Sequence, residues 1–297
     1  MSMYVTIQEF KNAPTGIDTS NIIPNGTQAQ NDAELYNVLM RASAWADKIC
    51  NQTLSATLNT ETKEITMNNK GLIRVHPDNV PIIQLLDRVQ YRVDPNGPWM
   101  PVPLTSIQVY NKYFTLYNLN SQYIAPGLAL QYPNMGYYTP QRLRYLQNIP
   151  LMIEYTYTNG YPNTALLAAN NAGDTTLSIQ NGIGINPGQT LTIYDSANTE
   201  EVVVQAITAG SNVGGSCTVQ LASPLLFSHA VAIPISAIPA IVKQAVILLA
   251  AYLIKERGSL SITMNESTLQ GVNRYQDAAD LDTAKDMLSQ FRRGVIS

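Results

Sequence analysis

Few residues in this sequence could do chemistry, and they are widely separated. The two histidines are His76, in RVHPDN, and His229, in LLFSHAV, and the two cysteines are Cys50 and Cys217. This spacing does not match a zinc site, which needs closely paired ligands. We therefore expect each histidine to be a hydrogen-bonded residue of a loop or a strand end. The cysteines are expected to be free, buried thiols in a reducing compartment.

Other motifs are equally poor in catalytic potential. The glycines of GIGINPG, at 182–188, match neither a dinucleotide-binding loop nor a phosphate-binding loop, so a turn is expected there. Glu200 and Glu201 are neighbours on an expected strand, where consecutive side chains point to opposite faces and cannot act as an acid–base pair. No Gly-x-Ser-x-Gly motif is present. The sequence therefore predicts no catalytic residue, no cofactor and no metal ion, and indicates that the protein is not an enzyme.

The composition argues against nucleic acid as a direct ligand. The chain has 297 residues and a net charge of −3, so it offers no basic field for a phosphate backbone. Charged residues make up 13% of the sequence, which is below the usual ~25%. Polarity comes instead from Asn, Gln, Thr and 17 tyrosines. Tyrosine in such numbers is typical either of a β-sheet surface or of wet, tightly packed interfaces.

The elements that would position any functional surface include an unusual helix, expected over 239–257. Its sequence, within IPAIVKQAVILLAAYLIKERG at 238–258, is apolar on nearly every side. Pro239 suits a first helical turn, and Gly258 stands where a helix commonly ends. The apolar run 245–254 is well short of the ~20 residues that cross a bilayer. Burial in a core or between subunits is therefore expected, and a membrane is not.

Two further helices are expected, over 31–50 and 277–293. The first would begin at Asn31, with Glu34 completing a capping box. Short β-rich segments, among them a strand expected over 82–92, occupy the region from 54 to 157, and 124–138 is readable as a strand pair or as a long loop. From 164 to 236 there are few charges and many turn signals, as in a small all-β sandwich or barrel, with strands expected over 176–179 and 217–221, among others.

The predicted class is therefore α+β, with a helical bundle core, a β-strand segment and an inserted all-β domain. Residues 1–163 plus 237–297 would form one domain, and 164–236 the insert.

Outside the insert, the chain resembles the phage head–tail connector (adaptor) family. The likeness rests on ASAWADKICN at 42–51, on VPIIQLLDRVQYR at 80–92, and on YTYTNGYP at 155–162 taken together with the helix at 238–258. In that family the last two pieces follow each other almost directly. Here roughly seventy residues separate them, which indicates a domain inserted in a surface loop. The insert itself resembles small β modules found on phage virion proteins.

The resemblance implies a structural virion protein of the neck, between head and tail, that is assembled in the host cytoplasm. It would form a homo-oligomeric ring of about twelve copies beneath the portal protein. The ring would extend the DNA channel to a downstream neck or tail protein, and DNA would pass through the lumen without specific binding. The insert would face a capsid or fibre protein. The three helices would form the body of the ring, with Trp45, Leu248, Leu249 and Tyr252 as its core candidates.

The C-terminal segment FRRGVIS is the expected attachment site. Arg292 and Arg293 end the last helix, where basic side chains favour the helix dipole and could also bind an acidic surface. Because connectors commonly attach to the portal through their C-terminus, the resemblance favours binding over a solvated helix end. The portal-binding candidates are Phe291, Arg292, Arg293, Val295 and Ile296.

A second function is open on the same sequence. A Tyr-rich β unit at 164–236 could bind carbohydrate or a receptor, which would make the chain a tail protein of another kind.

Overall fold

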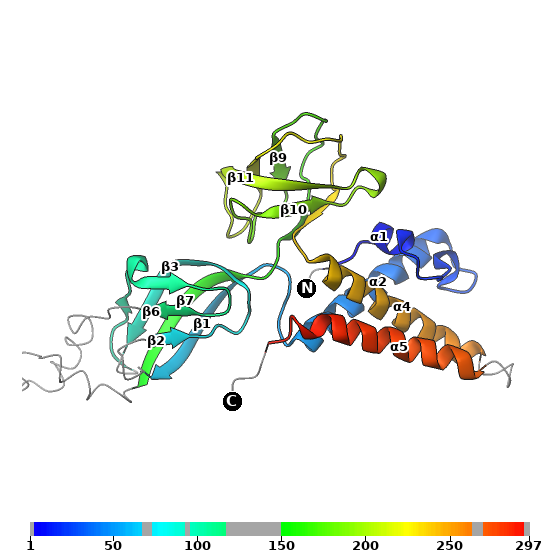
Figure 1. The fold of residues 1–297 in the computed structure, drawn as a ribbon, viewed down its shortest axis with the longest axis horizontal. Coiled ribbons are helices and arrows are strands. Elements are labelled where there is room, and N and C mark those ends of the chain that lie inside the picture. The colour runs from blue at the N-terminus through cyan, green and yellow to red at the C-terminus, as the bar shows by residue number, and fades with distance from the viewer. Residues whose placement is uncertain (1–2, 67–72, 93–95, 117–149, 263–269, 294–297) are drawn as a thin grey trace, which may run out of the picture. The chain divides into compact units, whose positions relative to one another are not determined.

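The protein is built mainly of antiparallel β-structure (Figure 1). The computed structural model describes residues 3–66, 73–92, 96–116, 150–262 and 270–293. These residues form three antiparallel sheets, one of them a half-barrel, and four α-helices. The predicted α+β class with a helical bundle core is therefore wrong. The expectation gave the helices too much weight, because two of the three hydrophobic cores are formed by strands and loops and contain no helical residue.

Residues 57–160 form one compact unit of two sheets. The larger sheet has the order β1 (Thr57–Thr66), β7 (Pro150–Asn159), β3 (Ile82–Arg92) and β4 (Met100–Pro101). The smaller has the order β2 (Ile73–Val75), β6 (Phe114–Leu116) and β5 (Ile107–Val109), and the short 3-10 helix η2 (Leu104–Ser106) precedes β5. Inward-facing side chains alternate along β7 and meet those of β3, β2 and β6 in a core of their own. The region 124–138, for which the sequence allows either a strand pair or a long loop, lies outside the described residues.

One carboxylate organises the polar side of that core. Glu61 of β1 accepts hydrogen bonds from the hydroxyls of Tyr155, at 2.6 Å, and Tyr157, and from the backbone N–H of Asp78 at 3.0 Å. Burial, reinforced by the neighbouring carboxylate, raises the pKa of both tyrosines far above the usual value. The two hydroxyls therefore stay neutral donors. This arrangement fixes the register of β1 on β7 and serves structure.

The other unit comprises residues 1–56 and 161–297, and it contains a six-stranded sheet. Its strand order is β8 (Asn163–Ala165), β13 (Pro234–Ser236), β10 (Thr190–Ile193), β11 (Glu200–Gly210), β12 (Cys217–Leu221) and β9 (Thr176–Ile179). The edges approach each other, because Leu167 donates to Ser178 at 2.8 Å and Gln180 donates to Ala165 at 2.9 Å. The sheet therefore curls around the third core. We call residues 163–236 the barrel.

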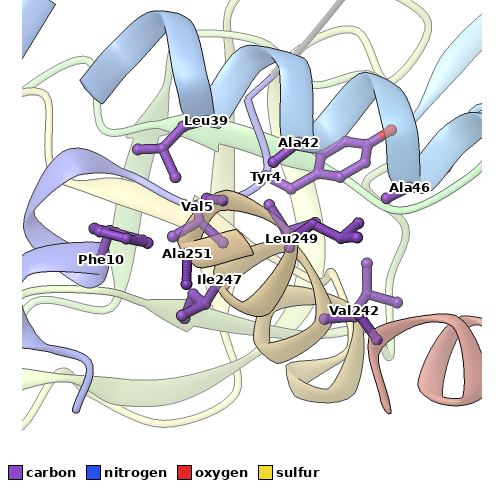
Figure 2. Close-up of a cluster of buried hydrophobic side chains, with 14 of the residues drawn as sticks. Tyr4, Val5, Phe10, Leu39, Ala42, Ala46, Val242, Ile247, Leu249 and Ala251 are labelled. Atoms are coloured by element: carbon purple, nitrogen blue, oxygen red, sulfur yellow. The ribbon is translucent and has the colours of Figure 1, made fainter. Parts of the chain in front are cut away.

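The helices of this unit enclose the remaining core. They are α1 (Ile7–Asn12), α2 (Gln28–Cys50), α4 (Ala240–Ile262) and α5 (Gln270–Ser289); the 3-10 helices η1 (Thr19–Asn21) and η4 (Ser196–Asn198) lie in loops. Helix α4 contacts both α2 and α5. Figure 2 shows side chains from the N-terminal segment, α1, α2 and α4 meeting in this cluster, among them Tyr4, Phe10, Leu39 and Leu249.

Hydrogen bonds connect the N-terminal segment to the end of α2. The Tyr4 hydroxyl donates to Asp47 at 2.5 Å and accepts from the backbone N–H of Leu54 and Ser55, at 3.2 and 3.1 Å. Burial, followed by the Asp47 charge, raises the pKa of Tyr4 well above 10.0. Tyr4 therefore remains a neutral donor that holds the first residues of the chain against α2.

The helix ends differ from the predicted ones. Helix α2 begins at Gln28, because Thr27 and Gln30 form the capping box that was expected of Asn31 and Glu34. Asn31 is instead buried, where its side chain donates to Ser20 O at 2.6 Å and accepts from Ile23 N at 2.8 Å.

The other two helices also have shifted ends. Helix α4 continues through Gly258 to Ile262, and α5 runs from Gln270 to Ser289 where 277–293 was expected. Propensity signals locate such ends poorly, because tertiary contacts decide which turns are retained.

Strand positions agree closely with the sequence. The segments 82–92, 176–179 and 217–221 are strands with the predicted bounds. Cys50 and Cys217 are free and buried, as predicted. No helix in the described ranges combines the length and hydropathy that a bilayer crossing requires.

Removing the barrel tests whether it is an insertion. The backbone N–H of Ala237 donates to Pro162 O at 2.8 Å, so the two connections lie side by side, and the helical core contains no residue of 164–236. Deleting 164–236 and joining Asn163 to Ala237 is expected to leave a soluble, helical protein. Circular dichroism and thermal unfolding check this. Aggregation, or loss of a cooperative transition, would contradict the insertion.

Candidate assembly surface

Helix α4 has one open side, and that side is largely apolar. Most of its residues from Val242 to Ala251 are buried, but Ile241 is 37% exposed, Gln244 is exposed and Leu248 is half-buried. Tyr252, also half-buried, follows at the same helical spacing. These four residues form a stripe along the helix. We call them the α4 stripe.

The ring-core candidates predicted from the sequence divide between the stripe and the core. Leu248 and Tyr252 belong to the stripe, and Trp45 of α2 meets Tyr252 edge-on, with ring centroids 5.9 Å apart. Trp45 is itself half-buried, so this aromatic pair continues the apolar surface from α4 to α2. Leu249 has no exposed area and packs inside the helical core. It therefore supports the helix and does not reach the surface.

A groove runs beside the stripe. It is lined by Gln244, Leu248 and Ala251 of α4, by residues 13–15, and by the ion pair of Lys255 with Asp280, 2.8 Å apart. Its lining is mixed, because apolar residues alternate with the polar side chains of Thr15, Gln244, Lys255 and Asp280. The groove therefore extends the surface beside the stripe with polar as well as apolar groups.

The C-terminal candidates lie past the end of α5. Phe291 is half-buried against the helical core, edge-on to Tyr161 with ring centroids 6.5 Å apart, and its carbonyl accepts from Gln52 at 2.8 Å. The backbone N–H of Arg293 donates to Cys50 O at 2.9 Å. The predicted placement of both arginines in the last turn of the helix is therefore wrong. Arg292 is exposed, whereas Val295 and Ile296 lie outside the described residues.

Comparison with known proteins leaves the family open. The chain has no match among family models, curated proteins or solved structures. The resemblance to phage connectors therefore stays a prediction.

The barrel holds a buried charged cluster around His229. The ring Nδ1 lies 2.9 Å from Asp195 Oδ2, and Nε2 lies 2.8 Å from Glu200 Oε1. Glu200 also accepts the backbone N–H groups of Leu226 and Phe227, at 2.9 and 3.1 Å. Although burial alone would raise the pKa of Glu200, these hydrogen bonds outweigh burial and lower it. The expected bonded, structural role of His229 is thus found.

This cluster lacks the features of a catalytic centre or a metal site. His229 and Glu200 are 2% and 7% exposed, so a substrate cannot reach them. Glu201 is exposed on the opposite face of β11, as the sequence predicted. In the part of the chain that the structure describes, no three His, Cys, Asp or Glu side chains come together as metal ligands would.

Lys243 was missed by sequence reasoning, although a lysine within an apolar helix is a visible signal. Its ammonium lies 2.6 Å from Glu9 Oε1 of α1 and 3.5 Å from the ring centroid of Tyr194 in the barrel. Burial lowers its pKa, while Glu9 opposes that shift. The residue thus joins α1, α4 and the barrel. Neither partner could be identified from spacing, since Glu9 lies 234 residues away in sequence.

The Glu200 cluster predicts acid-sensitive order in the loop that follows β12. A lowered pKa means that the folded state binds fewer protons than the unfolded state, so this stability is present above pH 4.5 and is lost as the pH falls through the lowered pKa. Glu200→Gln should therefore lower the free energy of local opening of the loop by roughly 1–3 kcal/mol. Peptides covering 222–232 should exchange their amide hydrogens correspondingly faster at neutral pH. The protection of these amides, expressed relative to the intrinsic exchange rate at each pH, should change less in the variant than in the wild type between about pH 5 and about pH 3.

Hydrogen–deuterium exchange with mass spectrometry measures both effects. Glu201→Gln is the matched control, because this neighbour is exposed and should leave the loop unchanged. Equal effects of the two substitutions would contradict the assigned role of Glu200.

Proposed function

We propose that this chain is a structural adaptor that assembles into a ring through the α4 stripe. The observation that supports this most is the exposure of apolar side chains on a helix whose residues from Val242 to Ala251 are mostly buried. Ile241, Leu248 and Tyr252, with Trp45 beside them, leave apolar area that a second copy would cover. A head-to-tail contact between copies closes into a ring when the rotation that relates one copy to the next divides a full turn into a whole number of steps.

The remaining parts of the proposal follow from the connector resemblance. The ring would stand in the virion neck, between the portal and a downstream neck or tail protein, with about twelve copies. The net charge of −3 agrees with a channel through which DNA slides without specific binding.

Carbohydrate binding, the second function considered, loses its main support. Residues 164–236 contain one tyrosine, Tyr194, one phenylalanine, Phe227, and no tryptophan. The expectation of a Tyr-rich β unit is therefore wrong, because the tyrosines lie mostly outside the barrel. Tyr194 carries the Lys243 ammonium on its ring. The barrel thus offers no extended aromatic platform for stacking on sugars.

Charge placed on the α4 stripe should prevent assembly. Leu248→Glu and Ile241→Glu each put a carboxylate into the proposed contact, where desolvation without a partner costs several kcal/mol. Sedimentation velocity over a concentration series is expected to show large oligomers for the wild type and monomers for both variants.

The control for this experiment is Leu104→Glu, at a similarly exposed position in η2. It should assemble like the wild type, and circular dichroism should show that all three variants are folded. A wild type that stays monomeric at every concentration would refute the ring, as would stripe variants that assemble normally.

Arg292 provides a test of the portal contact that leaves the core intact. Phe291 packs on the helical core, so truncation from Phe291 would disturb folding and binding together. Reversing the exposed charge with Arg292→Glu should weaken binding to a co-expressed portal ring by about tenfold if Arg292 meets an acidic surface. A pull-down at graded salt measures this, with Lys112→Glu as an exposed control in the other unit. Unchanged binding would contradict the assignment.

A further inference from the structure

The barrel carries an exposed apolar surface far from the α4 stripe in sequence. Leu226 is 73% exposed, Val231 57%, Leu167 49% and Phe227 39%. They come from two adjacent segments, since Leu166 and Asn170 exchange backbone hydrogen bonds with residues 229–233. We call these four residues the apolar loop.

The apolar loop is held in one conformation by bonds beneath it. Glu200 accepts the N–H groups of Leu226 and Phe227, and Leu225 donates to Asp174 O at 2.9 Å. His229 donates its backbone N–H to Asn170 O at 2.9 Å, while its ring lies between two carboxylates. A loop fixed in this way loses little conformational freedom on binding, which favours recognition. Leucine and phenylalanine exposed together on such a rigid support favour an apolar partner surface.

Charge identifies the kind of partner. The barrel contains the acids Asp174, Asp195, Glu200 and Glu201 and neither lysine nor arginine, whereas the rest of the chain holds all 18 basic residues and is close to neutral. Asp174 is joined to the apolar loop through Leu225, and Glu201 is exposed on β11. A field of this sign repels nucleic acid and anionic lipid and attracts basic groups.

We propose that the apolar loop docks another protein, one whose contact face is an apolar hollow bordered by lysine or arginine. A second copy of this chain is the less favoured occupant, because it would bring a net charge of −3 to the contact. The proposal does not depend on ring formation, since it uses only barrel residues.

Selection of random peptides on the immobilised full-length chain tests the proposal. Peptides that combine large apolar residues with lysine or arginine should be enriched. Binding of such a peptide should fall at least about tenfold in the double variant Leu226→Ser/Phe227→Ser. It should also weaken as salt is raised, because charge attraction contributes. Leu58→Ser, at an exposed position in β1 of the other unit, is the control and should bind like the wild type.

The remaining outcomes would overturn the proposal. Enriched peptides without basic residues, or binding that the double variant does not change, would reject the loop or its charge preference. Binding of the full-length chain to phosphatidylcholine–phosphatidylglycerol vesicles through Leu226 and Phe227 would show a lipid surface to be the partner instead. The Leu248→Glu variant should retain peptide binding, which separates this proposal from failure of the ring.

Discussion

The need to cover helix α4 shapes half of this protein. An apolar helix in water is unfavourable by roughly 25 cal/mol for each Å² of apolar surface left exposed, and α4 is apolar on nearly every side. The N-terminal segment, α1, α2 and α5 all contribute buried side chains to its core. The stripe from Ile241 to Tyr252 is apolar surface of α4 that the described elements of the chain leave at least partly uncovered. The assembly proposed here would continue the same burial that folds the monomer.

A few polar side chains in or beside the apolar cores join elements that are distant in sequence. Lys243 meets Glu9 and Tyr194, Tyr4 meets Asp47, and Glu61 receives two tyrosine hydroxyls. Each is a buried group whose hydrogen bonds compensate for the loss of water, so each fixes geometry more than it adds net stability. The cluster around His229 does the same for the apolar loop.

Local patterns predicted local structure well and the overall class poorly. Short β-rich runs at 82–92, 176–179 and 217–221 were sufficient to predict strands with the correct bounds, because turn residues such as Gly, Pro and Asn separate such runs. The class was wrong because sheet cores assemble from short segments whose pairing, such as that of β1 with β7, is not visible in sequence. For the candidate surface, the apolar character of α4 was predictable. Which of its sides stays open was not, because that depends on how α2 and α5 lie against it.

The connection of the barrel has a mechanical consequence. The two connections to the barrel leave it side by side. Asn163 and Ser236 are an antiparallel pair, and the next residues along the connections, Pro162 and Ala237, are hydrogen-bonded to each other. A partner that pulls on the barrel therefore loads two covalent connections at once. A tether of this design divides tension between its two strands, and it transmits force to the start of α4 and to the end of β7 at once.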